Sequence, residues 1–128
     1  MLAASLLAEP AEGESAAKIV TGRWTLHAPG HWKAELANVI WKAVRTKRTL
    51  PSQVEVLLSV AETFPVQSTD VSELWRGAVG RSLAFGHPVY DTLFVELADR
   101  LETKVASFDR GLRRRFPDFV RHPKELLV

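Results

Sequence analysis

Residues 89–109 read VYDTLFVELADRLETKVASFD and join an apolar stretch to a second, shorter one. Apolar side chains occupy almost every side of 89–101, which predicts a helix that neighbours cover on most sides. Residues 104–108 predict a short strand, and Asp109 can cap the basic helical turn that follows. The stretch therefore predicts a helix, a strand and a second helix in succession, with Asp91 in the first turn of the first helix.

The rest of the chain alternates in the same way. We expect helices at 2–8, 14–20, 31–46 and 52–64, and a further helix that Asp70 or Ser72 caps and Gly86 ends. Short strands are expected at 24–28, 65–69 and 119–120. This alternation predicts an α/β fold with a mainly parallel sheet and helices on both faces. In such sheets, functional sites form at the carboxyl ends of the strands.

Length and composition indicate one globular domain spanning 1–128. The chain is 46% hydrophobic and 25% charged, which is typical of a protein that folds around a core. It contains no cysteine, so disulfides and thiolate zinc sites are excluded. The apolar start lacks the basic region of a secretory signal, and no other stretch could span a bilayer. We therefore expect a cytoplasmic protein without a membrane segment.

Basic residues are concentrated in two places, although the net charge is only +2. Residues 104–124 contain seven basic residues and two acids. A second cluster contains no acid and consists of Lys42, Arg45, Lys47 and Arg48. Such clusters can bind nucleic-acid phosphates. Ordinary solvated faces explain them equally well, so charge alone does not decide between the two interpretations.

Three acids could carry chemistry, and each also has an ordinary structural explanation. Asp91 lies among apolar residues, where the helix macrodipole can stabilise it, and Asp109 can be an N-cap. Glu35 shares a helix face with Asn38 and can be a surface glutamate. An α/β fold could nevertheless bring all three acids to one sheet edge. Clustered carboxylates repel one another unless a cation such as Mg²⁺ or Mn²⁺ is bound, so a metal site is a plausible hypothesis.

Other kinds of site have weaker support. His27 and His31 have helix-like spacing, but Pro29 and Gly30 interrupt it, so a histidine-ligated zinc site is not expected. The glycines are too widely spaced for a phosphate-binding loop, and no serine lies in a nucleophile elbow.

Three blocks of the sequence resemble the PIN-domain family, specifically the VapC-type toxin ribonucleases of toxin–antitoxin pairs. They are AELANVIWKA at 34–43, VYDTLFVELA at 89–98 and SFDRGL at 107–112. Their order and spacing also agree with that family, and the resemblance extends over about residues 6–112. It implies a three-layer PIN-like fold in which these blocks carry the second, third and fourth acids of the active site.

The resemblance implies a role for each candidate residue. Glu35, Asp91 and Asp109 would hold Mg²⁺ or Mn²⁺ beside an RNA phosphodiester, and Asn38 and Ser107 would orient ligands or water. Phosphate contacts would come from five basic residues: Lys42, Arg45, Arg110, Arg113 and Arg114. The implied partners are the RNA substrate, a VapB-like antitoxin protein and a second copy of the chain.

The sequence departs from the family pattern at two places. Ser107 stands where threonine is common. More seriously, the family opens with a central strand that ends in an Asp, whereas this sequence starts at what resembles the following helix, and no Asp precedes Glu35. Two hypotheses follow: a ribonuclease whose first strand is missing from this sequence, or a catalytically silent PIN-like module that binds RNA or a protein partner.

Overall fold

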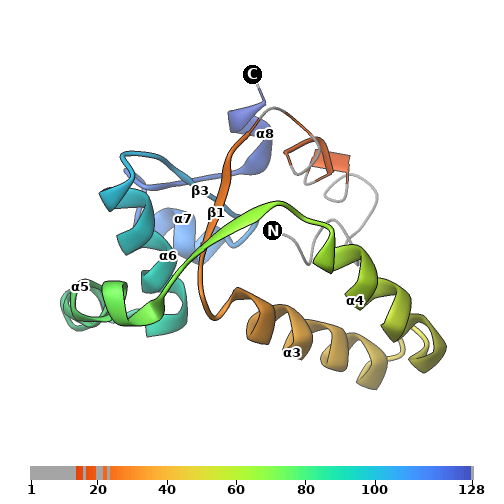
Figure 1. The fold of residues 1–128 in the computed structure, drawn as a ribbon. Helices are drawn as coiled ribbons and strands as arrows, with labels where there is room; N and C mark the ends of the chain where they lie inside the picture. Colours follow the sequence, from red (N-terminus) through yellow and green to blue (C-terminus); the bar gives the residue numbers. More distant parts are fainter. Residues whose placement is uncertain (1–13, 16, 20–21, 23, 128) are drawn as a thin grey trace. The chain divides into compact units, whose positions relative to one another are not determined.

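The structure, a computed structural model, describes residues 14–15, 17–19, 22 and 24–127 (Figure 1). The chain divides into two compact units, one comprising Met1–Leu26 and His31–Val66 and the other His27–Gly30 and Gln67–Val128. The expected helix at 2–8 lies outside the described residues, and the structure does not test the hypothesis of a missing first strand. The expectation of one domain over 1–128 stays a prediction.

The first unit is built on two helices. Helix α3 (Trp32–Arg45) buries Trp32, Leu36, Ile40 and Ala43, which recur every three or four residues along one face. A short 3₁₀ turn, η1 (Pro51–Gln53), leads into α4 (Val54–Glu62), which contacts α3. The predicted helices at 31–46 and 52–64 are confirmed, and the described residues of the predicted helix at 14–20 are helical.

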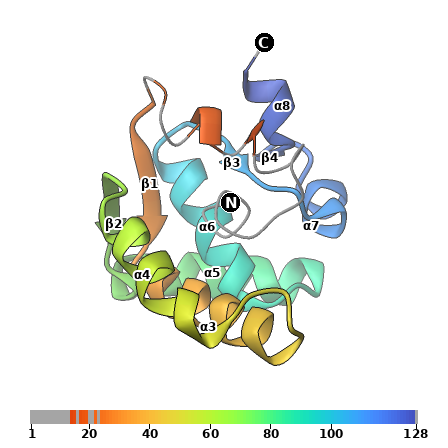
Figure 2. The same cartoon turned by 90° about the vertical axis from the view of Figure 1, so that its right-hand side faces the viewer.

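The second unit contains a pair of helices, α5 (Val71–Phe85) and α6 (Val89–Arg100), which lie side by side (Figures 1 and 2). Leu74 and Ala78 of α5 pack against Leu93 and Leu97 of α6. Both predicted ends of α5 are confirmed. The Asp70 side chain caps its start, and Gly86, with a φ of 64°, ends it in the left-handed conformation that glycine adopts without strain.

A second core connects α6 to the carboxyl-terminal elements. Val95 of α6 packs with Leu112 of α7 (Arg110–Arg115), with Phe116, and with Val120 of β4 (Val120–Arg121). Strand β3 (Val105–Ala106) pairs in parallel with β4, and α8 (Pro123–Leu126) follows. Helix α6 thus contributes to both cores, as its apolar sequence predicts.

The predicted strands at 24–28, 65–69 and 104–108 are each shorter in the structure, whereas the two-residue strand predicted at 119–120 lies one position later. Strand β1 (Leu26–Pro29) pairs with β2 (Val66–Thr69), and β3 pairs with β4, so the strands form two pairs. The predicted strand at 104–108 contains only Val105 and Ala106, because the Ser107 carbonyl accepts a hydrogen bond from the Arg113 guanidinium. The α/β class is confirmed. One mainly parallel sheet with helices on both faces stays a prediction. In the part of the chain that the structure describes, no helix is both long and apolar enough to cross a membrane.

Candidate active site

Asp91 occupies the first turn of α6, as the sequence predicts. Its Oδ2 atom lies 2.9 Å from Nε2 of His87, four residues earlier. An ionised carboxylate can only accept hydrogen bonds, so the His87 ring nitrogen is the donor. One oxygen of Asp91 is therefore held, while the side chain stays partly exposed.

The sequence analysis did not single out His87. It lies in the turn between α5 and α6, and its ring packs edge-on against Phe116 with the ring centroids 5.8 Å apart. The signal in the sequence is that His87 lies four residues before Asp91, because residues four apart are neighbours on a helix.

Asp109 is the N-cap of α7, which is the structural role that the sequence indicates for it. Its Oδ1 atom accepts a hydrogen bond from the Leu112 backbone N–H at 3.0 Å. The Asp109 backbone N–H in turn donates to the Ser107 hydroxyl at 3.0 Å. Ser107 and Asp109, two of the candidate residues, are thus in direct contact in the second unit.

Glu35 belongs to the first unit and lies in the first turn of α3. Its Oε1 atom is 2.6 Å from Nε2 of His31, the N-cap residue of that helix. Asn38 follows one turn later and is exposed. Within neither unit do the described residues place three or more His, Asp or Glu side chains close enough to hold a metal ion. The meeting of Glu35 with Asp91 and Asp109 stays a prediction.

The basic candidate residues differ in exposure and in the contacts that their side chains make within their own unit. Arg110 and Arg114 of α7 are exposed, and in the part of the chain that the structure describes neither forms a hydrogen bond or an ion pair. Arg113 is half-buried and donates to the Ser107 carbonyl at 3.0 Å. In the first unit, Lys42 is exposed, and the Arg45 guanidinium lies 4.9 Å from the centroid of the Trp41 ring. Arg110, Arg114 and Lys42 are therefore the most available for a phosphate.

A separate group of charges connects α5 to α6. The Glu96 carboxylate accepts hydrogen bonds from Nε of Arg81 at 2.9 Å and from Nε of Arg100 at 3.0 Å. Arg81 also pairs with Asp99. Burial raises the pKa of Glu96, but the hydrogen bonds and charges of the two arginines outweigh burial and bring that pKa below its usual value. Glu96 is thus held ionised between the helices.

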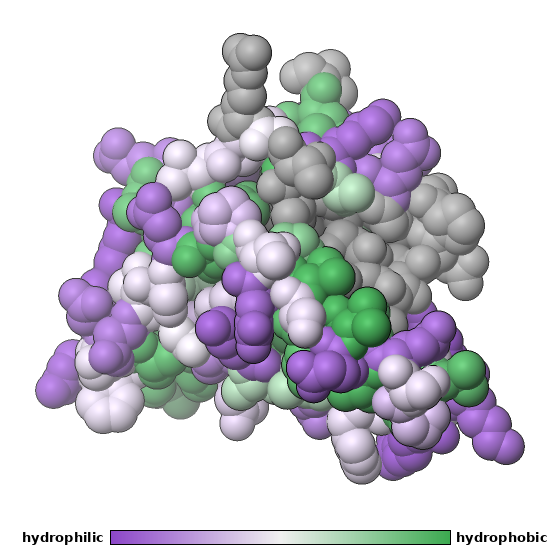
Figure 3. Space-filling model, turned by 45° about the vertical axis from the view of Figure 1, so that its right-hand side comes forward, coloured by the Kyte–Doolittle hydropathy of each residue, from purple (hydrophilic) through white to green (hydrophobic). Residues whose placement is uncertain are grey.

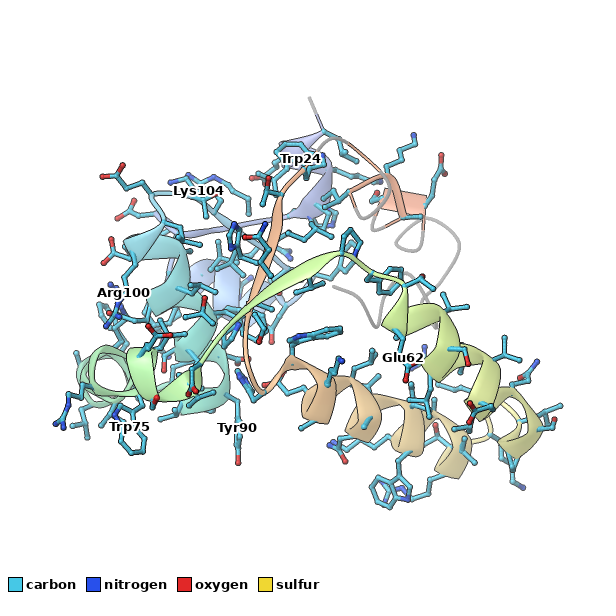
Figure 4. All side chains as sticks on the ribbon, in the orientation of Figure 1. Trp24, Glu62, Trp75, Tyr90, Arg100 and Lys104 are labelled. Carbon is cyan, nitrogen blue, oxygen red and sulfur yellow. The ribbon has the colours of Figure 1, made fainter. Side chains whose placement is uncertain are left out.

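Apolar side chains are exposed along α5. Trp75, Val79 and Leu83 recur every four residues and so share one face, and 82% of Leu83 is exposed. Figure 4 shows Trp75 of α5 and Tyr90 of α6 extending away from the ribbon. Other apolar side chains also reach the surface between hydrophilic ones, as the face drawn in Figure 3 illustrates. The α5 face is therefore available for an apolar contact.

The chain is similar over most of its length to proteins with a known activity. Ribonuclease VapC3 of Pyrobaculum aerophilum is 28% identical over 121 residues, which cover 91% of each chain. Ribonuclease VapC3 from two strains of Mycobacterium tuberculosis is 29% identical over 112 residues, which cover 88% of this chain and 80% of that protein. These relatives support a VapC-type family. No protein-family model matches the chain. The resemblance to VapC-type ribonucleases thus extends over most of the chain.

Proposed function

We propose that the chain is a VapC-type endoribonuclease with a PIN-like fold that hydrolyses RNA with a carboxylate-bound Mg²⁺ or Mn²⁺. The observation that carries the proposal is the similarity to ribonucleases over about nine-tenths of the chain. Asp91 and Asp109 lie within the blocks that resemble the family's active site, and both lie at helix starts.

The chemistry of the donor atoms fits a hard divalent cation. The second oxygens of Asp91 and Asp109 make no hydrogen bond or ion pair in the described part of the chain. Mg²⁺ and Mn²⁺ prefer such carboxylate oxygens as ligands. Glu35 would add a third carboxylate from α3. These three residues are the ones we propose to hold the ion.

Each part of the proposed site has its own task. The bound ion would supply a water of lowered pKa and would neutralise charge that develops on the phosphoryl oxygens. Ser107, which contacts the Asp109 backbone, and Asn38 would orient ligands or water. Arg110 and Arg114 would contact RNA phosphates, together with Arg113, Lys42 and Arg45. Phosphate contacts supply affinity rather than sequence choice.

The proposal includes the partners of a VapC-type toxin. These are a VapB-like antitoxin, a second copy of the chain and cellular RNA in the cytoplasm. The exposed face of α5 supports self-association, because an apolar stripe can pair with its own copy across a twofold axis.

A second candidate function is the catalytically silent PIN-like module, which would bind RNA or a protein without cleaving RNA. The observation in its favour is that, within either unit, the described residues place no group of three or more His, Asp or Glu side chains where they could hold a metal ion. Fewer carboxylates would hold a divalent ion less tightly.

The test is RNA cleavage with Mg²⁺ or Mn²⁺, using the 128-residue chain and a version extended upstream by a strand that ends in Asp. We expect cleavage by at least the extended version, loss of cleavage in Asp91→Asn, and retention in Asp118→Asn, which alters an exposed acid outside the proposed site. RNA binding without cleavage by either version would favour the silent module. Neither binding nor cleavage would contradict both candidates.

A further inference from the structure

Two candidate carboxylates share the same local arrangement. Glu35 lies four residues after His31, and Asp91 lies four residues after His87, each acid in the first turn of its helix. In each pair the histidine Nε2 atom approaches a carboxylate oxygen, at 2.6 Å for Glu35 and 2.9 Å for Asp91. The arrangement thus occurs once in each unit, on different helices.

The exposure of these side chains differs from that of an ordinary surface ion pair. The His31 and His87 side chains are 13% and 15% exposed, whereas the Glu35 and Asp91 side chains are 38% and 36% exposed. A typical surface pair at this spacing has two mobile, solvated partners and stabilises a helix by only about 0.2–0.5 kcal/mol. Here the donor is held in the interior while the acceptor still reaches solvent.

The surroundings of His87 keep its ring in place. Gly86 ends α5 in the left-handed conformation, and Pro88 begins α6, so the backbone on both sides of His87 is restricted. The ring also packs against Phe116, a core residue that follows α7. Because Asp109 caps the other end of α7, the same helix fixes both the support of His87 and the backbone of Asp109.

A hydrogen bond to one oxygen of a carboxylate restricts rotation of the group and defines where the other oxygen lies. Residues that hold metal ligands in this way are a regular part of metal sites, and their loss weakens metal binding. Asp109 has an equivalent support, because the Leu112 backbone N–H holds its Oδ1 atom. Asp91 and Asp109 therefore each have a fixed hydrogen-bond donor on one oxygen.

We propose that His87 is a positioning residue that holds Asp91 in the orientation that binds the divalent ion. This inference rests on the proposed function. It assigns to His87 the role of hydrogen-bond donor, without contact with the RNA.

Two substitutions at His87 separate the donor from the ring. His87→Phe keeps an aromatic ring against Phe116 but removes the N–H donor, whereas His87→Gln keeps a donor and removes the ring. His122→Phe is the matched control, because the His122 ring also packs edge-on against a phenylalanine, Phe108, and lies at a helix start. Mn²⁺ binding would be measured by calorimetry on the chain that is active in the cleavage assay, with Tm recorded for every variant.

We expect His87→Phe to weaken Mn²⁺ binding on the order of tenfold or more, with a Tm close to that of the unsubstituted chain. His87→Gln should retain most of the affinity, and His122→Phe should retain all of it. High Mn²⁺ concentrations should restore cleavage by His87→Phe, because the defect lies in metal affinity.

Unchanged Mn²⁺ affinity in His87→Phe would overturn the inference while leaving the proposed ribonuclease intact. The inference would also be overturned if Mn²⁺ affinity fell equally in His87→Phe and His87→Gln and Tm fell with it. That result would indicate that His87 has a packing role. If the unsubstituted chain shows no Mn²⁺ binding that depends on Asp91, the proposed function fails and the inference fails with it.

Discussion

Replacing Gly77 by alanine tests the charge group between α5 and α6. A Cβ atom at Gly77 would lie less than 3.0 Å from both oxygens of the Glu96 carboxylate, which real Cβ atoms essentially never do. The carboxylate would have to move, although Arg81 and Arg100 both hold it. Glycine at this position is thus explained by the space that Glu96 needs.

Two opposing effects set the size of the change. Alanine in a helix is favoured over glycine by about 1 kcal/mol. Displacing Glu96 weakens two hydrogen bonds between charged groups, each of which contributes about 1.5–3 kcal/mol in general. Arg100 is half exposed, so its share is reduced by solvent screening. The loss exceeds the gain, and we expect Gly77→Ala to lower the free energy of unfolding by about 1–3 kcal/mol.

The assay is urea unfolding of four chains: the unsubstituted chain, Gly77→Ala, Glu96→Ala and the double variant. Glu96→Ala removes the three atoms that lie nearest to a Cβ at position 77. Gly77→Ala should then raise the free energy of unfolding by about 1 kcal/mol in the Glu96→Ala background. The reasoning is refuted if Gly77→Ala stabilises the unsubstituted chain, or if it destabilises both backgrounds equally.

Three further predictions concern acid stability, the cap of α7 and self-association. Because the native pKa of Glu96 lies below its usual value of 4.5, its contribution to stability is complete above that value and is lost as the pH falls through the native pKa; Glu96→Gln should flatten the acid side of the urea midpoint plotted against pH. Asp109→Asn should keep the helix cap yet abolish RNA cleavage, whereas Asp109→Ala should also cost about 1 kcal/mol of stability by urea unfolding, and equal stability of the two variants would contradict the capping role. Leu83→Glu should convert a dimer to a monomer in light scattering with Tm unchanged, and a persistent dimer would exclude this face of α5.

The helices could be predicted because their signals are local. Asp70 caps the start of α5, and Gly86 and Pro88 define the end of α5 and the start of α6, as the sequence predicts. Strand lengths depend on hydrogen bonds to distant segments. The strand before Asp109 was predicted too long because a guanidinium from α7, and not a neighbouring strand, bonds to the Ser107 carbonyl.

The candidate acids and the cap formed by Asp109 could be found from sequence, but the packing that fixes His87 beside Asp91 could not. Asp91 stands out because it is charged in an apolar stretch, and Asp109 because it follows a strand pattern. The role of His87 depends on Phe116, which lies 29 positions later and packs against the ring only after α7 docks on α6. A pattern of spacings contains no information on such a contact. For the same reason, the approach of Glu35 to the other acids stays a prediction.

The structural contacts of Asp109 and Asp91 do not compete with their proposed role as metal ligands. An N-cap uses one carboxylate oxygen of Asp109, and the hydrogen bond from His87 uses one oxygen of Asp91. A carboxylate has two oxygens, so a cap or a histidine partner leaves the second one available and also limits where it can lie. A ligand fixed in this way loses less conformational freedom when a cation binds than a freely rotating surface acid does. The cap at Asp109 and the histidine contact at Asp91 are therefore compatible with the metal site that we propose.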